Sequence, residues 1–292
     1  MDRIRKALDL ARLQRVQSAE PAERVAAVPV GEPAVNSAAE PEVIKRGVEP
    51  TPVSVLAPPM SIVYQRTRVF TPASEILEAN RVVSPGSEDP AAAAFRMLRT
   101  QVLQRMDANG WRSLAIFSPG ANDGKTTTAI NLAISLANDR RHTVILVDFD
   151  FRRATLAARW GLAPEFGGDD ALTGAAPVED CLYHPEGFER LVLLPARSTL
   201  ANSSEVIAGP RSRELVQELR SRYPERIVVF DLPPVLNADD ALAFAPLVEC
   251  GLVVAAEGRT RRNDLLRTIE LLHKIPLVGT VLNCAADAPS GY

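Results

Sequence analysis

Residues 113–127 read SLAIFSPGANDGKTT, and the segment that follows, TAINLAISLAND, is apolar on nearly all sides. The run SLAIF favours a strand, and the loop after it ends in Gly124-Lys125-Thr126. A strand, a glycine-containing loop that ends in GKT and a buried helix form the local arrangement of a phosphate-binding loop. The sequence therefore predicts a P-loop here, although the first glycine of the usual GxxxxGKS/T pattern is absent.

The chemistry of such a loop gives its residues definite roles. Backbone N–H groups of the loop and of the helix N-terminus point at the phosphates. Lys125 would supply positive charge to the β- and γ-phosphates, and the Thr126 hydroxyl would be a ligand for Mg²⁺. The binding residues that we expect are Ser118, Gly120, Asn122, Asp123, Gly124, Lys125, Thr126 and Thr127.

Two later β-favouring runs end in acids. Asp148 and Asp150 follow one run, in VILVDFDFRR, and Asp231 ends another, in IVVFDLPP. The carboxyl ends of parallel strands share one crevice, which is the crevice that a phosphate loop faces. Carboxylates there can hold Mg²⁺ or accept a proton from an attacking hydroxyl. Each acid alone is also typical of a solvated loop or a helix N-cap, but together they predict a catalytic group of Lys125, Asp148, Asp150 and Asp231.

Short β-favouring runs alternate with helical patterns beyond Trp111. The runs are residues 113–117, 143–147, 191–194, 227–230, 252–255 and 277–282. Such alternation favours an α/β fold, with a mostly parallel central sheet and helices on both faces. Asp89-Pro90 predicts the start of a further helix, with Phe95, Leu98, Val102 and Met106 on one stripe.

The first 63 residues contain no Phe, Trp or Tyr. Residues 1–16 predict a short basic amphipathic helix, which is either solvated or docks to a partner or an anionic membrane surface. Residues 17–63 are rich in Pro, Ala and Glu and predict a disordered tether, because they cannot bury enough apolar surface. The remaining residues, 64–292, would form one nucleotide-binding domain with a short tail at 284–292.

Charge and composition argue against several classes of protein. The 33 basic and 36 acidic residues give a net charge of −3, so no global basic surface is available for nucleic acid. No apolar run reaches the roughly 18 residues of a membrane span, and the N-terminus lacks the apolar region of a secretory signal. The three cysteines, Cys181, Cys250 and Cys284, predict neither a disulfide framework nor a zinc site. We therefore expect a cytoplasmic protein.

The motifs, taken as a set, resemble those of one family. GKTTTAINLA, VILVDFDFR, IVVFDLPPVLNADDA, EGRTRR after a strand, and VLN resemble the cytoplasmic domain of bacterial tyrosine kinases. These are the autokinases that regulate capsule and exopolysaccharide synthesis, within the wider group of the Mrp and MinD ATPases. The resemblance covers about residues 64–283. The basic first helix and Pro-rich tether are similar to the branch found with exosortase-type exopolysaccharide loci.

The resemblance implies a P-loop fold that uses ATP and Mg²⁺ to transfer the γ-phosphate to tyrosine. It implies that Asp148 ligates Mg²⁺ or activates the tyrosine hydroxyl, that Asp231 holds the metal through water, and that Asn283 lies against adenine. Arg152, the arginine of the DxDxR motif, is implied in nucleotide binding. The resemblance also implies a homo-oligomer, activated by a membrane-embedded polysaccharide chain-length (co-polymerase) protein at the inner face of the cell membrane.

Two positions depart from the family pattern. The family's helix usually carries ExxRxxR for subunit contacts; Arg96 and Arg99 are present as candidate oligomer contacts, but Ala93 stands in the acid position. The family's tail usually carries a tyrosine cluster, whereas Tyr292 is the sole tail tyrosine and the candidate phosphoacceptor. Both departures weaken the case for efficient autophosphorylation and leave ATP binding untouched.

Two alternative functions stay open. The first is an ATPase switch of the MinD, ParA or Mrp kind, but those proteins carry an extra lysine in KGGxGKT where this chain has Gly120. The second is a non-catalytic ATP-binding scaffold of the polysaccharide synthesis complex, which the altered helix and sparse tail favour. A GTPase is disfavoured because the chain has no NKxD motif.

Overall fold

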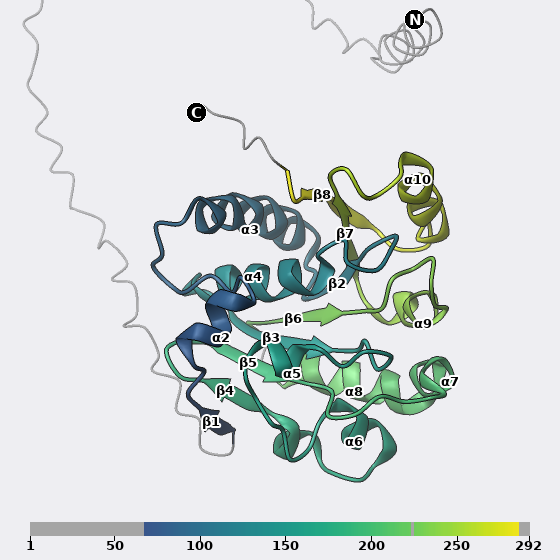
Figure 1. Ribbon diagram of the computed structural model, residues 1–292. Helices are drawn as coiled ribbons and strands as arrows, with labels where there is room; N and C mark the ends of the chain where they lie inside the picture. Colours follow the sequence, from purple (N-terminus) through teal and green to yellow (C-terminus); the bar gives the residue numbers. More distant parts are fainter. Residues whose placement is uncertain (1–66, 223–224, 286–292) are drawn as a thin grey trace, which may run out of the picture. The chain divides into compact units, whose positions relative to one another are not determined.

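A computed structural model describes residues 67–222 and 225–285 (Figure 1). The chain divides into two units, Met1–Leu56 and Ala57–Tyr292, and all described residues belong to the second. The predictions for residues 1–16 and 17–63 and for Tyr292 lie outside the described residues. The domain boundaries therefore stay predictions.

The described residues form an eight-stranded sheet in the order β1-β4-β5-β3-β6-β2-β7-β8. The strands are β1 (Arg68–Phe70), β2 (Ser113–Phe117), β3 (Thr143–Asp148), β4 (Tyr183–Pro185), β5 (Leu191–Leu194), β6 (Arg226–Asp231), β7 (Cys250–Ala256) and β8 (Leu277–Asn283). Within this sheet β4 and β5 pair antiparallel and the other neighbours pair parallel. The predicted mostly parallel sheet is confirmed, and all six predicted strands are present.

Helices connect the strands. They are α2 (Ser74–Ala79), α3 (Pro90–Asn109), α4 (Lys125–Ala137), α5 (Leu156–Arg159), α6 (Gly168–Thr173), α7 (Ser203–Ala208), α8 (Pro210–Ser221), α9 (Asp240–Phe244) and α10 (Arg262–Leu271), with 3-10 turns at Val178–Cys181 and Ala245–Leu247. The predicted start of α3 is confirmed, because the Asp89 side chain accepts a hydrogen bond from the Ala91 N–H at 2.8 Å and Pro90 is the first helical residue. No helix within the described ranges has the length and apolar character that crossing a membrane requires.

Two apolar layers cover the two faces of the sheet. Side chains alternate between the faces along a strand, so Leu114 and Ile116 pack with α3 and α4, whereas Ala115 and Phe117 belong to the layer under α8 and α9. Figure 1 shows α3 and α4 on one side of the sheet and α6, α7 and α8 on the other. The central strands are buried on both faces, which is why they read as continuous apolar runs.

Candidate active site

The phosphate loop connects β2 to α4 at the carboxyl end of the sheet, where β2 lies between β6 and β7. Hydrogen bonds within the loop hold its shape. Ser118 Oγ donates to the Gly120 carbonyl at 2.9 Å, and the Gly120 N–H donates to Asp123 Oδ2 at 2.8 Å. Asn122 adopts a left-handed backbone conformation with φ 66°. The loop therefore has one defined conformation, built from residues that the sequence assigned to phosphate binding.

Gly124, which precedes α4, is required by both conformation and space. Its φ is +90°, and a Cβ built there would lie 1.7 Å from Asn283 Nδ2. The Asn283 amide donates to the Asp123 carbonyl at 3.1 Å. The end of β8 thus packs directly against the phosphate loop, and only glycine allows this approach.

Lys125 lies among buried carboxylates. Its Nζ is 2.5 Å from Asp231 Oδ1 and 3.8 Å from Asp150 Oδ2. The four side chains of Lys125, Asp148, Asp150 and Asp231 are all buried, and Asp148 and Asp231 are fully so. The structure thus brings together the predicted catalytic group from α4, from β3 and the loop that follows it, and from β6, as expected for strand ends that share one crevice.

Asp148 and Asp150 have different surroundings. Asp148 is fully buried, and its two oxygens accept hydrogen bonds from the Asp150 and Leu156 N–H groups, each at 3.1 Å. Burial, together with the nearby Asp231 carboxylate, raises the pKa of Asp148 to about 8. The pKa of Asp150 is also raised, chiefly by burial. Asp150, unlike Asp148, lines the cavity above the phosphate loop.

The donor set fits Mg²⁺. Asp150 Oδ1 and Asp231 Oδ2 are buried and have no hydrogen-bond partner in the structure. Unpaired buried carboxylate oxygens are costly unless they face a cation. The described residues contain no group of three or more His, Cys, Asp or Glu side chains that could hold a metal ion by themselves. Mg²⁺ characteristically needs only one or two carboxylates, with waters and substrate phosphates as its other ligands.

A cavity of about 590 Å³ opens above the loop. Among the predicted site residues, those on its wall are Ser118, Gly120, Asn122, Gly124, Lys125, Thr126, Thr127, Asp150 and Asn283. Asp123, Asp148 and Asp231 are buried and do not line it. Arg152 does not line it either, because its guanidinium pairs with Asp240 instead.

Four arginines on the cavity wall were not predicted: Arg81, Arg153, Arg159 and Arg259. Arg159 Nη1 donates to Thr127 Oγ1 at 3.1 Å, and Arg259 donates to the Asn122 carbonyl. Arg153 directly follows the DxDxR motif and Arg259 lies in the EGRTRR segment, so both had a sequence signal. Arg81, just after α2, and Arg159, on the four-residue α5, had none. These arginines give the cavity the positive charge that suits a polyphosphate.

Arg96 and Arg99 lie away from the catalytic group, on α3. Arg96 Nη1 donates to the Ser87 carbonyl at 3.3 Å, and Arg99 Nη1 donates to the Ser135 carbonyl at 3.1 Å. These contacts brace α3 within its own chain. A role for either arginine in contacts between subunits stays a prediction.

Comparisons with known proteins agree with this geometry. Residues 114–274 match the family described as AAA domain. The chain is 26% identical over 209 residues to the tyrosine-protein kinase ptk of Acinetobacter johnsonii, covering 70% of this chain and 28% of ptk. It is 26% identical over 191 residues to the tyrosine-protein kinase YwqD of Bacillus subtilis, covering 65% of this chain and 79% of YwqD. The chain therefore spans about a quarter of some relatives and most of others.

Solved structures with a similar fold include a bacterial kinase domain and a MinD ATPase. The VpsO kinase domain superposes with a TM-score of 0.60 at 29% identity, covering 67% of this chain and 95% of that domain. MinD from Pyrococcus horikoshii, solved with Mg-ADP, gives a TM-score of 0.52 at 26% identity, covering 61% of this chain and 72% of MinD. The chain belongs to the bacterial tyrosine kinase family, within the AAA-domain and MinD-like P-loop ATPases.

Proposed function

We propose that this chain is an ATP- and Mg²⁺-dependent protein-tyrosine kinase that regulates exopolysaccharide or capsule biosynthesis. The observation that carries the proposal is the position of the Lys125 ammonium, 2.5 Å from Asp231 and 3.8 Å from Asp150 at the base of the phosphate loop. Lysine, hydroxyl and carboxylates at this place are the parts that phosphoryl transfer requires. Relatives that match most of the chain bear the name tyrosine-protein kinase.

The positions of the site residues give each of them a different role in the proposed reaction. Loop N–H groups and Lys125 hold the phosphates, while Thr126 and Asp231 would hold Mg²⁺. When bound, Mg²⁺ neutralises charge on the transferring phosphates. Asp150 is better placed than Asp148 to accept the tyrosine proton, because it lines the cavity and has a free buried oxygen. Asp148, enclosed by two backbone N–H groups, would orient the Asp150 loop.

The remaining parts of the proposal concern the nucleotide base and the partners. Asn283 lies on the cavity wall beside the loop, as a contact to adenine requires. ExoP of Rhizobium meliloti, named a succinoglycan biosynthesis transport protein, is 31% identical over 217 residues, and the chain covers 26% of it. This supports a membrane polysaccharide co-polymerase as activator, with the chain held peripherally at the inner face of the cell membrane. We also propose a homo-oligomer that uses Arg96 and Arg99, and a nucleotide-binding domain that begins near residue 64.

The test is incubation of the full chain with ATP and Mg²⁺, with and without the co-polymerase, followed by phosphosite mapping. The expected result is phosphotyrosine, mapped to Tyr292 and lost in Lys125→Met. Tyr292→Phe is the matched control, because it removes the acceptor and leaves the phosphate loop intact. Nucleotide-dependent dimerisation without phosphotyrosine would show that the chain is an ATPase switch rather than a kinase. ATP binding without ATP turnover or dimerisation would show that it is a scaffold.

A further inference from the structure

The Arg152 side chain points to α9 rather than to the phosphate cavity. Its Nε donates to Asp240 Oδ1 at 2.9 Å, and its Nη2 lies 2.7 Å from the same oxygen. A weaker contact at 3.4 Å joins Nη2 to Asp239. The two guanidinium nitrogens that make these contacts are thus directed at the first turn of α9. Arg152 lies only two residues after Asp150, so this contact holds the end of the Asp150 loop.

Asp240 is a fully buried acid with both oxygens engaged. Its second oxygen accepts a hydrogen bond from Ser203 Oγ, at the start of α7. Three connections therefore meet at this one carboxylate: the loop after β3, the start of α7 after β5, and the start of α9 after β6. A buried carboxylate is stable only while such partners are in place.

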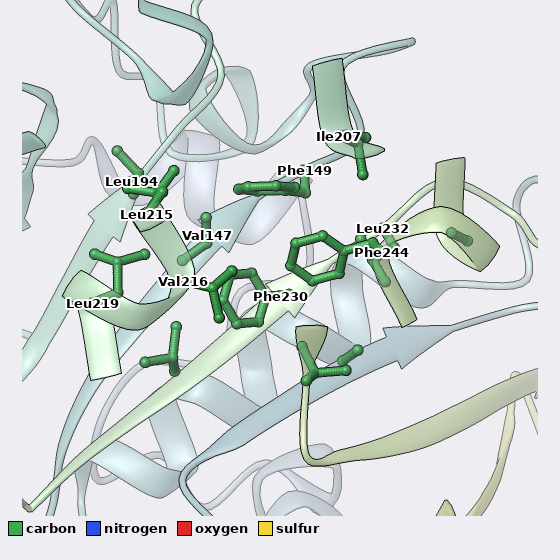
Figure 2. Close-up of a cluster of buried hydrophobic side chains, with 14 of the residues drawn as sticks. Val147, Phe149, Leu194, Ile207, Leu215, Val216, Leu219, Phe230, Leu232 and Phe244 are labelled. Carbon is green, nitrogen blue, oxygen red and sulfur yellow. The ribbon is translucent and has the colours of Figure 1, made fainter. Parts of the chain in front are cut away.

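The other end of α9 packs against the strands that carry the catalytic acids. The ring of Phe244 lies 4.6 Å from that of Phe149 and 4.9 Å from that of Phe230, between centroids. Phe149 lies between Asp148 and Asp150, and Phe230 directly precedes Asp231. Figure 2 shows the three rings clustered beside Leu232. Helix α9 is thus fixed to both acid-bearing backbones by rings at one end and by an ion pair at the other.

We propose that Arg152, Asp240 and Ser203 form a clamp that sets the position of Asp150 relative to Asp231 and Lys125, which makes Arg152 and Asp240 positioning residues. This inference rests on the proposed kinase function. The Asp150 carboxylate needs such support, because its ion pair to the catalytic lysine is long, at 3.8 Å, its Oδ1 has no hydrogen-bond partner, and its backbone hydrogen bond comes from Arg153 of the same loop. The position of the carboxylate therefore depends on the path of the backbone from Asp150 to Arg153, and the clamp holds that backbone at Arg152. The expected role of Arg152 in nucleotide binding becomes an indirect one.

The test compares Arg152→Gln, Asp240→Asn and the double variant, with Asp239→Asn as matched control. Asp239 is adjacent, acidic and 74% exposed in its side chain, but it makes only the weak contact. Three measurements are made on the full chain: kcat and KM for ATP, the Mg²⁺ concentration that half-saturates binding of a fluorescent ADP, and the melting temperature.

The expected result is that each clamp variant lowers kcat about 10- to 100-fold, which is the effect of a misplacement of about 1 Å. The KM for ATP should change little, and the half-saturating Mg²⁺ concentration should rise, because the unpaired Asp150 Oδ1 is one of the two carboxylate oxygens of the Mg²⁺ donor set. The double variant should be no worse than either single variant, since both remove the same contact. Arg152→Lys should recover part of the loss, because it keeps one donor, and Asp239→Asn should behave as wild type.

The clamp is overturned if Arg152→Gln weakens ADP binding without Mg²⁺ while Asp240→Asn does not, because Arg152 would then touch phosphate itself. It is also overturned if both variants lower only the melting temperature. If Asp240→Asn does not fold, the result for Arg152→Gln decides. The Arg152 side chain is 45% exposed, so its substitution should leave the protein folded. If the wild type makes no phosphotyrosine, the kinase proposal fails, but the Mg²⁺ dependence of ADP binding still tests the clamp.

Discussion

Lys125 Nζ lies 2.5 Å from Asp231 Oδ1, and the two side chains are 6% and 0% exposed. This buried pair joins the start of α4 to the end of β6, across the strand β2 that leads into the phosphate loop. A buried ion pair gains little over an apolar pair of the same shape, but losing one partner is costly. The pair is therefore better explained by function than by stability.

Lys125→Met should destabilise the fold as well as abolish phosphoryl transfer. It leaves Asp231 buried beside Asp150 without its cation, which costs about 3–5 kcal/mol. Adding Asp231→Asn should restore part of that stability and none of the activity. Urea unfolding of the two variants measures this difference. If the double variant is no more stable than Lys125→Met, the unpaired Asp231 carboxylate is not what destabilises Lys125→Met.

The stability of the fold should fall with rising pH through Asp148. Its pKa is raised to about 8 in the folded protein, whereas an unfolded carboxyl titrates near 4. Between these values the folded state binds more protons than the unfolded state, so the free energy of unfolding decreases as pH rises, by at most about 1.4 kcal/mol per unit. Urea titrations from pH 5 to 8 should show a flatter slope for Asp148→Asn. Equal slopes in the two proteins would contradict this cause.

Gly124→Ala should strain the phosphate loop in two ways. A side chain at φ +90° costs roughly 1–2 kcal/mol, and its Cβ would overlap the Asn283 amide at 1.7 Å. Adding Asn283→Ala should relieve the overlap and leave the conformational strain, so the double variant should be more stable than Gly124→Ala but less stable than Asn283→Ala. Thermal unfolding checks this order. Gly120→Ala is the matched control for stability, because its Cβ would meet Asp123 only at 3.4 Å.

Arg259→Gln should weaken nucleotide binding about 10- to 100-fold, the range for a lost hydrogen bond to a charged group. Arg259 lines the cavity and also donates to the Asn122 carbonyl of the phosphate loop. Fluorescent ADP titration at low and high salt should show a smaller salt dependence in the variant. Arg211→Gln on α8, whose arginine pairs with Glu214 outside the cavity, should change neither value. Equal loss in both variants would point to overall charge rather than to this site.

Most of the fold follows from local patterns. The strands β2, β3, β5, β6, β7 and β8 were all predicted, because each is a largely apolar run of four to seven residues, which is long enough to show its composition. β1 and β4 were not predicted, because each has only three residues, which are too few to show an alternation of apolar and polar side chains. Tyr183 of β4 is also held by the distant residues Glu165 and Phe166, whose N–H groups donate to its hydroxyl.

The amino-acid sequence alone determines that this chain has a phosphate loop with acids at two strand ends, because the patterns that indicate strand, loop and helix are local in the sequence. It does not determine where neighbouring side chains point. Along 148–152 the backbone buries Phe149 and Phe151, directs Asp150 to the cavity, and sends Arg152 to Asp240, 88 residues away. Those directions depend on packing against α9 and β6, and packing between segments distant in sequence exists only once the chain has folded.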